Sequence, residues 1–102
     1  MSLSDTPPKR FRIYGLTSPH DDLAIRYVGQ TMSPLHERLT EHLRVRGTSA
    51  RADWLRSLVR ANLKPGIVQL EEIRGTRRDA YTAETRWIKR LRSEGHQLLN
   101  VP

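Results

Sequence analysis

The sequence predicts an α+β domain in which helices flank a small three-stranded antiparallel sheet. Residues 9–16, 24–30 and 67–73 are β-branched and aromatic runs of strand length. The three other long segments repeat apolar residues at helical spacing: 34–46, 50–63 and 77–94. Turn formers separate these segments, which gives the order β-β-α-α-β-α without repeats.

The first two strands are expected to form an antiparallel hairpin. In residues 9–16, Phe11 and Ile13 face one way, and Arg12 and Tyr14 face the other. The polar link TSPHDD joins this run to residues 24–30 and is rich in turn formers.

Two helices are expected next. Ser33 can cap the first, with Pro34 at its first position and Gly47 after its end; its apolar stripe is Leu35, Leu39 and Leu43. Ser49 can cap the second, and Lys64-Pro65-Gly66 stops it. The second buried stripe is predicted to be Trp54, Leu55, Leu58, Val59 and Leu63.

The third strand, 67–73, is followed by Gly75 and a last helix. Thr76-x-x-Asp79 has the spacing of a capping box, and Gly95 ends the helix. The apolar stripe of this helix is Ala80, Ala83, Trp87, Ile88 and Leu91. Residues 96–102 are expected to run along the surface or an edge.

The chain of 102 residues is expected to form one domain over 9–102, after a flexible lead-in over 1–8. It has no cysteine, which excludes disulfides and thiolate metal sites and favours a reducing compartment. No apolar run is long enough to span a bilayer, and the opening residues lack the apolar core of a signal peptide. We therefore expect a soluble, cytoplasmic protein without a membrane partner.

The net charge of +7 points to a nucleic-acid partner. Fifteen of the eighteen basic residues are arginine, whose planar fork suits bidentate contact with phosphate. Ribosomal and membrane-surface proteins are also basic, so the charge alone does not identify the partner.

Glu84 interrupts the apolar stripe of the last helix, four residues after Ala80 and four before Ile88. A semi-buried carboxylate needs compensation. One interpretation is a salt bridge to an arginine. The other is a ligand for a hard divalent cation, since Mg²⁺ is commonly held by one carboxylate with waters and substrate oxygens.

Four more polar residues are candidates for a site. Arg38 and His42 are four residues apart and share one side of the first helix; they could bind phosphate and move a proton, or simply face solvent. Tyr14 and Tyr27 lie on neighbouring strands, where packing is the ordinary role of tyrosine. A phenol would need a nearby cation to become a base.

The joint order of these residues resembles the GIY-YIG nuclease superfamily over about residues 10–100. The two tripeptides in the family's name, GIY and YIG, are matched by Ile13-Tyr14 and by Tyr27-Val28-Gly29. The family's helix arginine and histidine, its later glutamate and its late asparagine are matched in the same order by Arg38, His42, Glu84 and Asn100. The segments YVGQT with LHERLTEH, and ETRWIKRLRSEGHQLLN, carry most of the likeness. Arg12 stands where the family has glycine, and the helix-like segment 46–63 is longer than in many relatives.

The resemblance implies an endonuclease that hydrolyses DNA with a single Mg²⁺ or Mn²⁺. In that scheme Glu84 holds the metal, Arg38 binds the phosphate, and Tyr14, Tyr27 and His42 activate water, with the proton acceptor among these three left open. Asn100 would orient a ligand or tie down the tail. The expected partner is DNA, including branched, nicked or flapped forms, with a fused or separate specificity domain.

Two other classes of function fit parts of the sequence. A non-catalytic nucleic-acid-binding module would use the arginines alone and show salt-dependent binding without turnover. A protein-interaction domain would use Trp54 and Trp87 as anchors, although both lie on apolar stripes that favour core packing.

Overall fold

A computed structural model describes residues 7–101, so most of the expected lead-in lies outside the described residues. The predicted α+β class and order are confirmed. The elements are β1 (Lys9–Ser18), β2 (Asp21–Thr31), α1 (Leu35–Leu43), α2 (Ala50–Arg60), β3 (Gly66–Gly75) and α3 (Arg77–Ser93).

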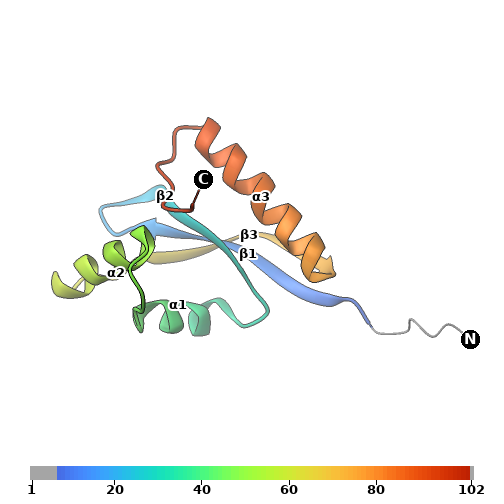
Figure 1. The fold of residues 1–102 in the computed structure, drawn as a ribbon, viewed down its shortest axis with the longest axis horizontal. Coiled ribbons are helices and arrows are strands. Elements are labelled where there is room, and N and C mark those ends of the chain that lie inside the picture. Colours follow the sequence, from blue (N-terminus) through green and yellow to red (C-terminus); the bar gives the residue numbers. More distant parts are fainter. Residues whose placement is uncertain (1–6, 102) are drawn as a thin grey trace, which may run out of the picture.

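The three strands form one antiparallel sheet in the order β2-β1-β3, with β1 in the centre. Helix α3 covers one face, and α1 and α2 lie on the other (Figure 1). The hairpin predicted for the first two strands is present, although each strand is longer than expected. No helix in residues 7–101 is long and apolar enough to cross a membrane.

The core has two parts because β1 is buried on both faces. Ile13 and Val28 pack under α3 with Ala83 and Leu91. On the other face, Tyr14 and Leu16 pack with Leu55 of α2, and Leu35 and Leu39 of α1 lie against them. Successive residues of one strand point to opposite faces, so the pair Ile13-Tyr14 contributes to both parts.

A bulge in β2 decides which side chains reach the α1 face. Leu16 pairs with Tyr27, but its neighbour Thr17 pairs with Ile25, so Arg26 is an extra residue. An extra residue reverses the alternation of faces. Ile25 therefore packs toward α3, while Tyr27 packs with the Tyr14 cluster.

Three local expectations differ from the structure. Helix α1 ends at Leu43, before the expected residue 46, because the chain leaves the helix at Arg44 and Val45 packs into the second core cluster. Ser33 does not cap α1: the cap residue is Pro34, without a side-chain bond, and the Ser33 amide donates to the Thr31 hydroxyl. Val59, expected in the core, is 52% exposed because α2 buries only its Ala52, Leu55 and Leu58 side.

The capping box of α3 is confirmed. The Asp79 amide donates to Thr76 Oγ1 at 3.2 Å, and the Thr76 amide donates to Asp79 Oδ2 at 2.8 Å. These bonds satisfy two of the donors that a helix start leaves free. They fix where α3 begins, with Thr76 as the one residue between β3 and α3.

Replacing Thr76 with alanine should lower the free energy of unfolding by about 1 kcal/mol, because one cap bond is lost. Urea denaturation measures the change. The control is Thr82→Ala at an exposed position inside the same helix, which should leave the stability equal or slightly higher. Equal losses in both variants would contradict a special role of the cap.

Candidate active site

The centre of the candidate site is the hydroxyl of Tyr14, a side chain with no exposed surface. Arg38 Nε donates to this oxygen at 3.0 Å. On the other side, the oxygen lies 2.7 Å from Nε2 of His42. The structure thus brings together three residues that the sequence placed on the first strand and the first helix.

The protonation states of Tyr14 and His42 determine which group donates each hydrogen bond in this network. Burial, partly offset by the bond from Arg38, raises the pKa of Tyr14 to about 12, so the phenol is neutral at pH 7. Burial, reinforced by the charges of Arg38 and Arg51, lowers the pKa of His42 to about 4, so the imidazole is neutral as well. Arginine can only donate. We therefore assign Tyr14 as acceptor from Arg38 and donor to His42 Nε2, with the ring proton of His42 on Nδ1.

His42 does not face solvent. It is 5% exposed and is the only buried residue of α1. Edge-on contacts hold its ring against Tyr14 and Tyr27, with both centroids 5.7 Å away. Two phenols thus fix the imidazole, which excludes the interpretation of this position as a solvated helix flank.

Gly29 permits this arrangement. It lies opposite Tyr14 in the pairing of β1 with β2. A Cβ at this position would collide with the Tyr14 hydroxyl and come within 2.6 Å of its Cζ. The glycine that completes Tyr27-Val28-Gly29 is therefore needed for the close approach of the Tyr14 ring to β2.

Glu84 does not form the arginine salt bridge that was one of its two interpretations. It lies half-buried on α3, the helix on the opposite face from α1, and its Oε2 accepts from Gln30 Nε2 at 2.8 Å. Within residues 7–101, no ion pair involves this carboxylate. Burial is the main cause of the raised pKa of Tyr14, and the negative charge of Glu84 adds a smaller contribution in the same direction.

The oxygen atoms of Glu84 and Gln30 are suitable ligands for a hard divalent cation. Glu84 is an anion without a cationic partner among the described residues, and the neighbouring Gln30 Oε1 is buried without a hydrogen-bond partner. Carboxylate and amide oxygens suit Mg²⁺, which usually keeps several waters and few protein ligands. Residues 7–101 contain no cluster of three or more acidic, histidine or cysteine side chains that could hold a metal ion without further ligands.

Asn100 lies against β2 and not in the Tyr14 cluster. Its amide accepts from the Val28 N–H at 2.9 Å and donates to the Val28 carbonyl at 2.8 Å. The Leu99 amide adds a bond to the Arg26 carbonyl. The tail thus runs along an edge, as expected, and covers the free side of β2 next to Tyr27 and Gly29.

Arg12, which occupies the position of the family's glycine, donates through Nη1 to the Ser33 carbonyl at 3.3 Å. It therefore ties β1 to the loop that leads into α1.

Two residues near the site were not identified from the sequence. Gln30 binds Glu84, and Arg51 of α2 lies over the ring of Tyr27, with its Cζ 5.4 Å from the centroid. Gln30 directly follows the Tyr27-Val28-Gly29 motif, and that proximity was an available signal. Arg51 gave none, because its contact depends on how α2 packs beside β2.

Comparison with known families agrees with this geometry. A model of the GIY-YIG catalytic domain matches residues 10–98, which is most of the chain. The chain belongs to the GIY-YIG catalytic-domain family, which indicates a nuclease-type function and a nucleic-acid substrate. Such nucleases generally depend on divalent metal ions. No curated protein and no solved structure matches the chain.

The low pKa of His42 makes stability depend on pH. With a folded-state pKa of about 4 and an unfolded value of about 6.5, the unfolded chain binds more protons between these values. The free energy of unfolding should therefore fall as the pH decreases from 6.5 to 4, by about 3 kcal/mol. Urea denaturation across this range measures it.

The matched pair for this measurement is His42→Gln and His36→Gln. His36 is exposed on the same helix, so its variant should keep the decrease, whereas the His42 variant should lose most of it. Parallel pH curves for the wild type and the His42 variant would refute the assignment of a buried neutral imidazole.

Gly29→Ala should displace the Tyr14 ring and lower the free energy of unfolding by about 1–3 kcal/mol, since the added methyl group has no space. Denaturation measures the loss, and the chemical shifts of the His42 ring report whether its bond to Tyr14 persists. A variant with wild-type stability and unchanged His42 shifts would show that the ring is not confined by this glycine.

Proposed function

We propose that this chain is a metal-dependent endonuclease that hydrolyses phosphodiester bonds in DNA. The observation that carries the proposal is the buried hydroxyl of Tyr14, held at hydrogen-bond distance from both Arg38 Nε and His42 Nε2. A guanidinium, a phenol and a neutral imidazole in one chain of contacts can bind phosphate and move a proton. A module that only binds nucleic acid has no need for such a relay.

Arg38 is the proposed phosphate ligand. Its Nε is bound to Tyr14 and its Nη1 to Glu41 at 3.0 Å, and its Nη2 makes no hydrogen bond or ion pair within residues 7–101. The pair with Glu41 is partly exposed, so it is weak. A phosphate can therefore bind at Nη2 and displace Glu41, while the bond to Tyr14 keeps the guanidinium in place.

The proton of the attacking water is proposed to leave through Tyr14. One lone pair of the phenol oxygen accepts from Arg38, and the second is the proposed acceptor for the water. Because Tyr14 has no exposed surface, this step requires substrate binding to open a path for the water to that oxygen. As the water O–H bond breaks, Tyr14 takes that proton and passes its own to His42 Nε2, which becomes an imidazolium. The hydroxide oxygen forms the new bond to phosphorus, and the ester oxygen departs.

Substrate binding should strengthen His42 as a base. After burial, the charges of Arg38 and Arg51 are what keep its pKa low. A phosphate between these cations would offset their charge and raise the pKa of the imidazole. Tyr27 confines the ring during this change through its edge-on contact.

Glu84 is the proposed holder of Mg²⁺ or Mn²⁺, with Gln30 fixing the carboxylate. When bound, the ion supplies Lewis-acid stabilisation of charge on the phosphate and the departing oxygen. Asn100 is proposed to act as a positioning residue, because it binds the backbone of β2 between Tyr27 and Gly29. Nicked, branched or flapped DNA, alone or presented by a specificity domain, are the substrate forms to compare.

Glu84→Gln and Arg38→Ala should each reduce cleavage by about a hundredfold or more, since each removes a charge at the reacting phosphate. A plasmid-nicking assay with Mg²⁺ or Mn²⁺ measures this. Glu94→Gln, at an exposed position after the same helix, is the control and should cleave normally.

Circular dichroism checks that the variants fold, and Arg38→Gln, which also removes the charge but keeps an N–H donor, replaces Arg38→Ala if the alanine variant does not. Full activity of the Glu84 variant would exclude its metal role. Gel shifts in EDTA separate loss of cleavage from loss of binding: DNA binding by the wild type without any cleavage would favour the non-catalytic module.

A further inference from the structure

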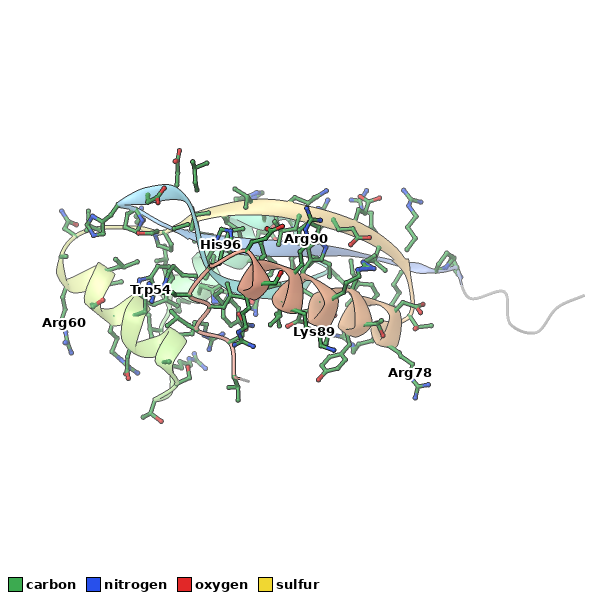
Figure 2. All side chains as sticks on the ribbon, turned by 90° about the horizontal axis from the view of Figure 1, so that it is seen from above. Trp54, Arg60, Arg78, Lys89, Arg90 and His96 are labelled. Atoms are coloured by element: carbon green, nitrogen blue, oxygen red, sulfur yellow. The ribbon has the colours of Figure 1, made fainter. Side chains whose placement is uncertain are left out.

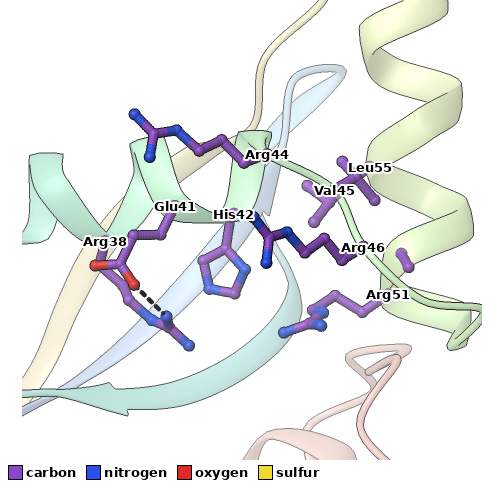
Figure 3. Close-up of a pocket in the computed structure, with 9 residues that line it drawn as sticks. Arg38, Glu41, His42, Arg44, Val45, Arg46, Arg51 and Leu55 are labelled. Carbon is purple, nitrogen blue, oxygen red and sulfur yellow. Dashed lines mark hydrogen bonds and ion pairs between the residues drawn. The ribbon is translucent and has the colours of Figure 1, made fainter.

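A basic cavity of about 310 Å³ lies between α1 and α2, beside the candidate site (Figure 3). Arg38 and His42 form part of its wall, so it is continuous with the phosphate-binding position proposed above. Its one acidic residue is Glu41. Three further arginines line the cavity: Arg44, Arg46 and Arg51. The cavity therefore has a large excess of positive charge.

The arginines are directed at a common point. In Figure 3, the side chains of Arg46 and Arg51 extend toward His42, with Arg38 on the other side of the imidazole, whereas Arg44 points away above α1. Arg46 and Arg51 have no acidic partner within residues 7–101. Two unneutralised guanidinium groups thus face the position where the first phosphate is expected.

The loop that carries Arg46 is fixed by its own contacts. Gly47 has a φ of +85°, and its carbonyl accepts from the guanidinium of Arg56. Ser49 then caps α2 by accepting from the Ala52 amide at 3.1 Å. Arg51 consequently lies in the first turn of an 11-residue helix, where the helix dipole adds to the attraction for anions.

We propose that this cavity is a second anion subsite, which binds a backbone phosphate of the polynucleotide next to the scissile phosphate held by Arg38. Arg46 and Arg51 are its ligands, and Arg44 contributes charge from outside. The planar forks of arginine suit bidentate phosphate contact, and such contacts set the register of a strand without reading its sequence. The helix-like segment 46–63 thereby gains a role in placing the strand over the Tyr14 cluster.

This inference rests on the proposed function, because it takes the ligand to be nucleic acid. The test measures binding without metal, so that it is independent of cleavage. A short duplex DNA of arbitrary sequence is titrated in EDTA at several salt concentrations with the wild type, Arg46→Gln and Arg46→Gln/Arg51→Gln. Arg46 is exposed, so the single variant is expected to fold and remains informative if the double variant is unstable.

The control is Arg60→Gln/Arg78→Gln, which makes the same change in charge at exposed positions at opposite ends of the molecule (Figure 2). If Arg46 and Arg51 each bind a phosphate, the double variant should lose about tenfold in affinity. Its slope of log K against log salt should be smaller by about 1.8, or about 0.9 for each contact. The loss should be equal on two unrelated sequences, and the control should keep the wild-type slope.

Equal changes in slope for the cavity variants and the control would overturn the inference, because the cavity would then add only general charge. Arg51→Lys separates charge from packing on Tyr27: it should keep most of the wild-type slope, and a slope smaller by about 0.9, the change expected for loss of one contact, would contradict phosphate binding. If the wild type does not cleave DNA, but the cavity variants have a smaller salt slope and the control does not, the nuclease proposal fails and the subsite stands. If the wild type cleaves DNA, but the cavity variants and the control change the slope equally, the nuclease proposal stands and the subsite fails.

Discussion

The arrangement of the site depends on the need to satisfy one buried phenol. Tyr14 has no exposed surface, yet its hydroxyl requires hydrogen-bond partners, since an unpaired buried polar group costs about 1–3 kcal/mol. Arg38 and His42 meet that need, and both come from α1. Packing of α1 on the sheet is therefore tied to the geometry of the site, and a shift of the helix would break bonds that stabilise the core.

The sheet separates the arginine-lined cavity from the candidate metal ligand. The cavity lies on the face of α1 and α2, whereas Glu84 approaches from α3 on the other face and is bound by Gln30 of β2. Strand β2 lies between them, and its glycine lets the Tyr14 ring approach this edge. Because the carboxylate does not pair with any arginine within the described residues, its charge remains free to act on a cation.

Much of the fold could be predicted from periodicity and caps, because these signals are local. The capping box at Thr76, the hairpin and the opposite facing of Ile13 and Tyr14 all follow from patterns within a few residues. The early end of α1 could not, since it reflects the packing of Val45 against residues far along the chain. Val59 was misplaced for a related reason: a helical stripe shows which side is apolar, but not how much of it a neighbour will cover.

The same distinction applies to the site. The positions of Tyr14, Tyr27, Arg38 and His42 could be inferred from their spacing and from the family resemblance, and the structure brings these four together. Gln30 had a local signal in its place after the Tyr27-Val28-Gly29 motif, but its bond to Glu84 depends on the placement of α3. The contact of Arg51 with Tyr27 depends on the bulge at Arg26 and on the placement of α2, which no local pattern encodes.

Closure of β2 by residues 96–100 affects how this protein folds. The bonds from Val28 to Asn100 span 72 positions, and the Ile25 amide reaches His96 over 71. Closing loops of this length has an entropic cost that must be met before the contacts stabilise the fold, so we expect these bonds to form late in folding. A chain that has folded only its first two strands and α1 therefore still has an open strand edge, available for wrong pairing, at the very place where Tyr27 and Gly29 must be held. Organisation of the site and protection from aggregation are completed by the same few residues.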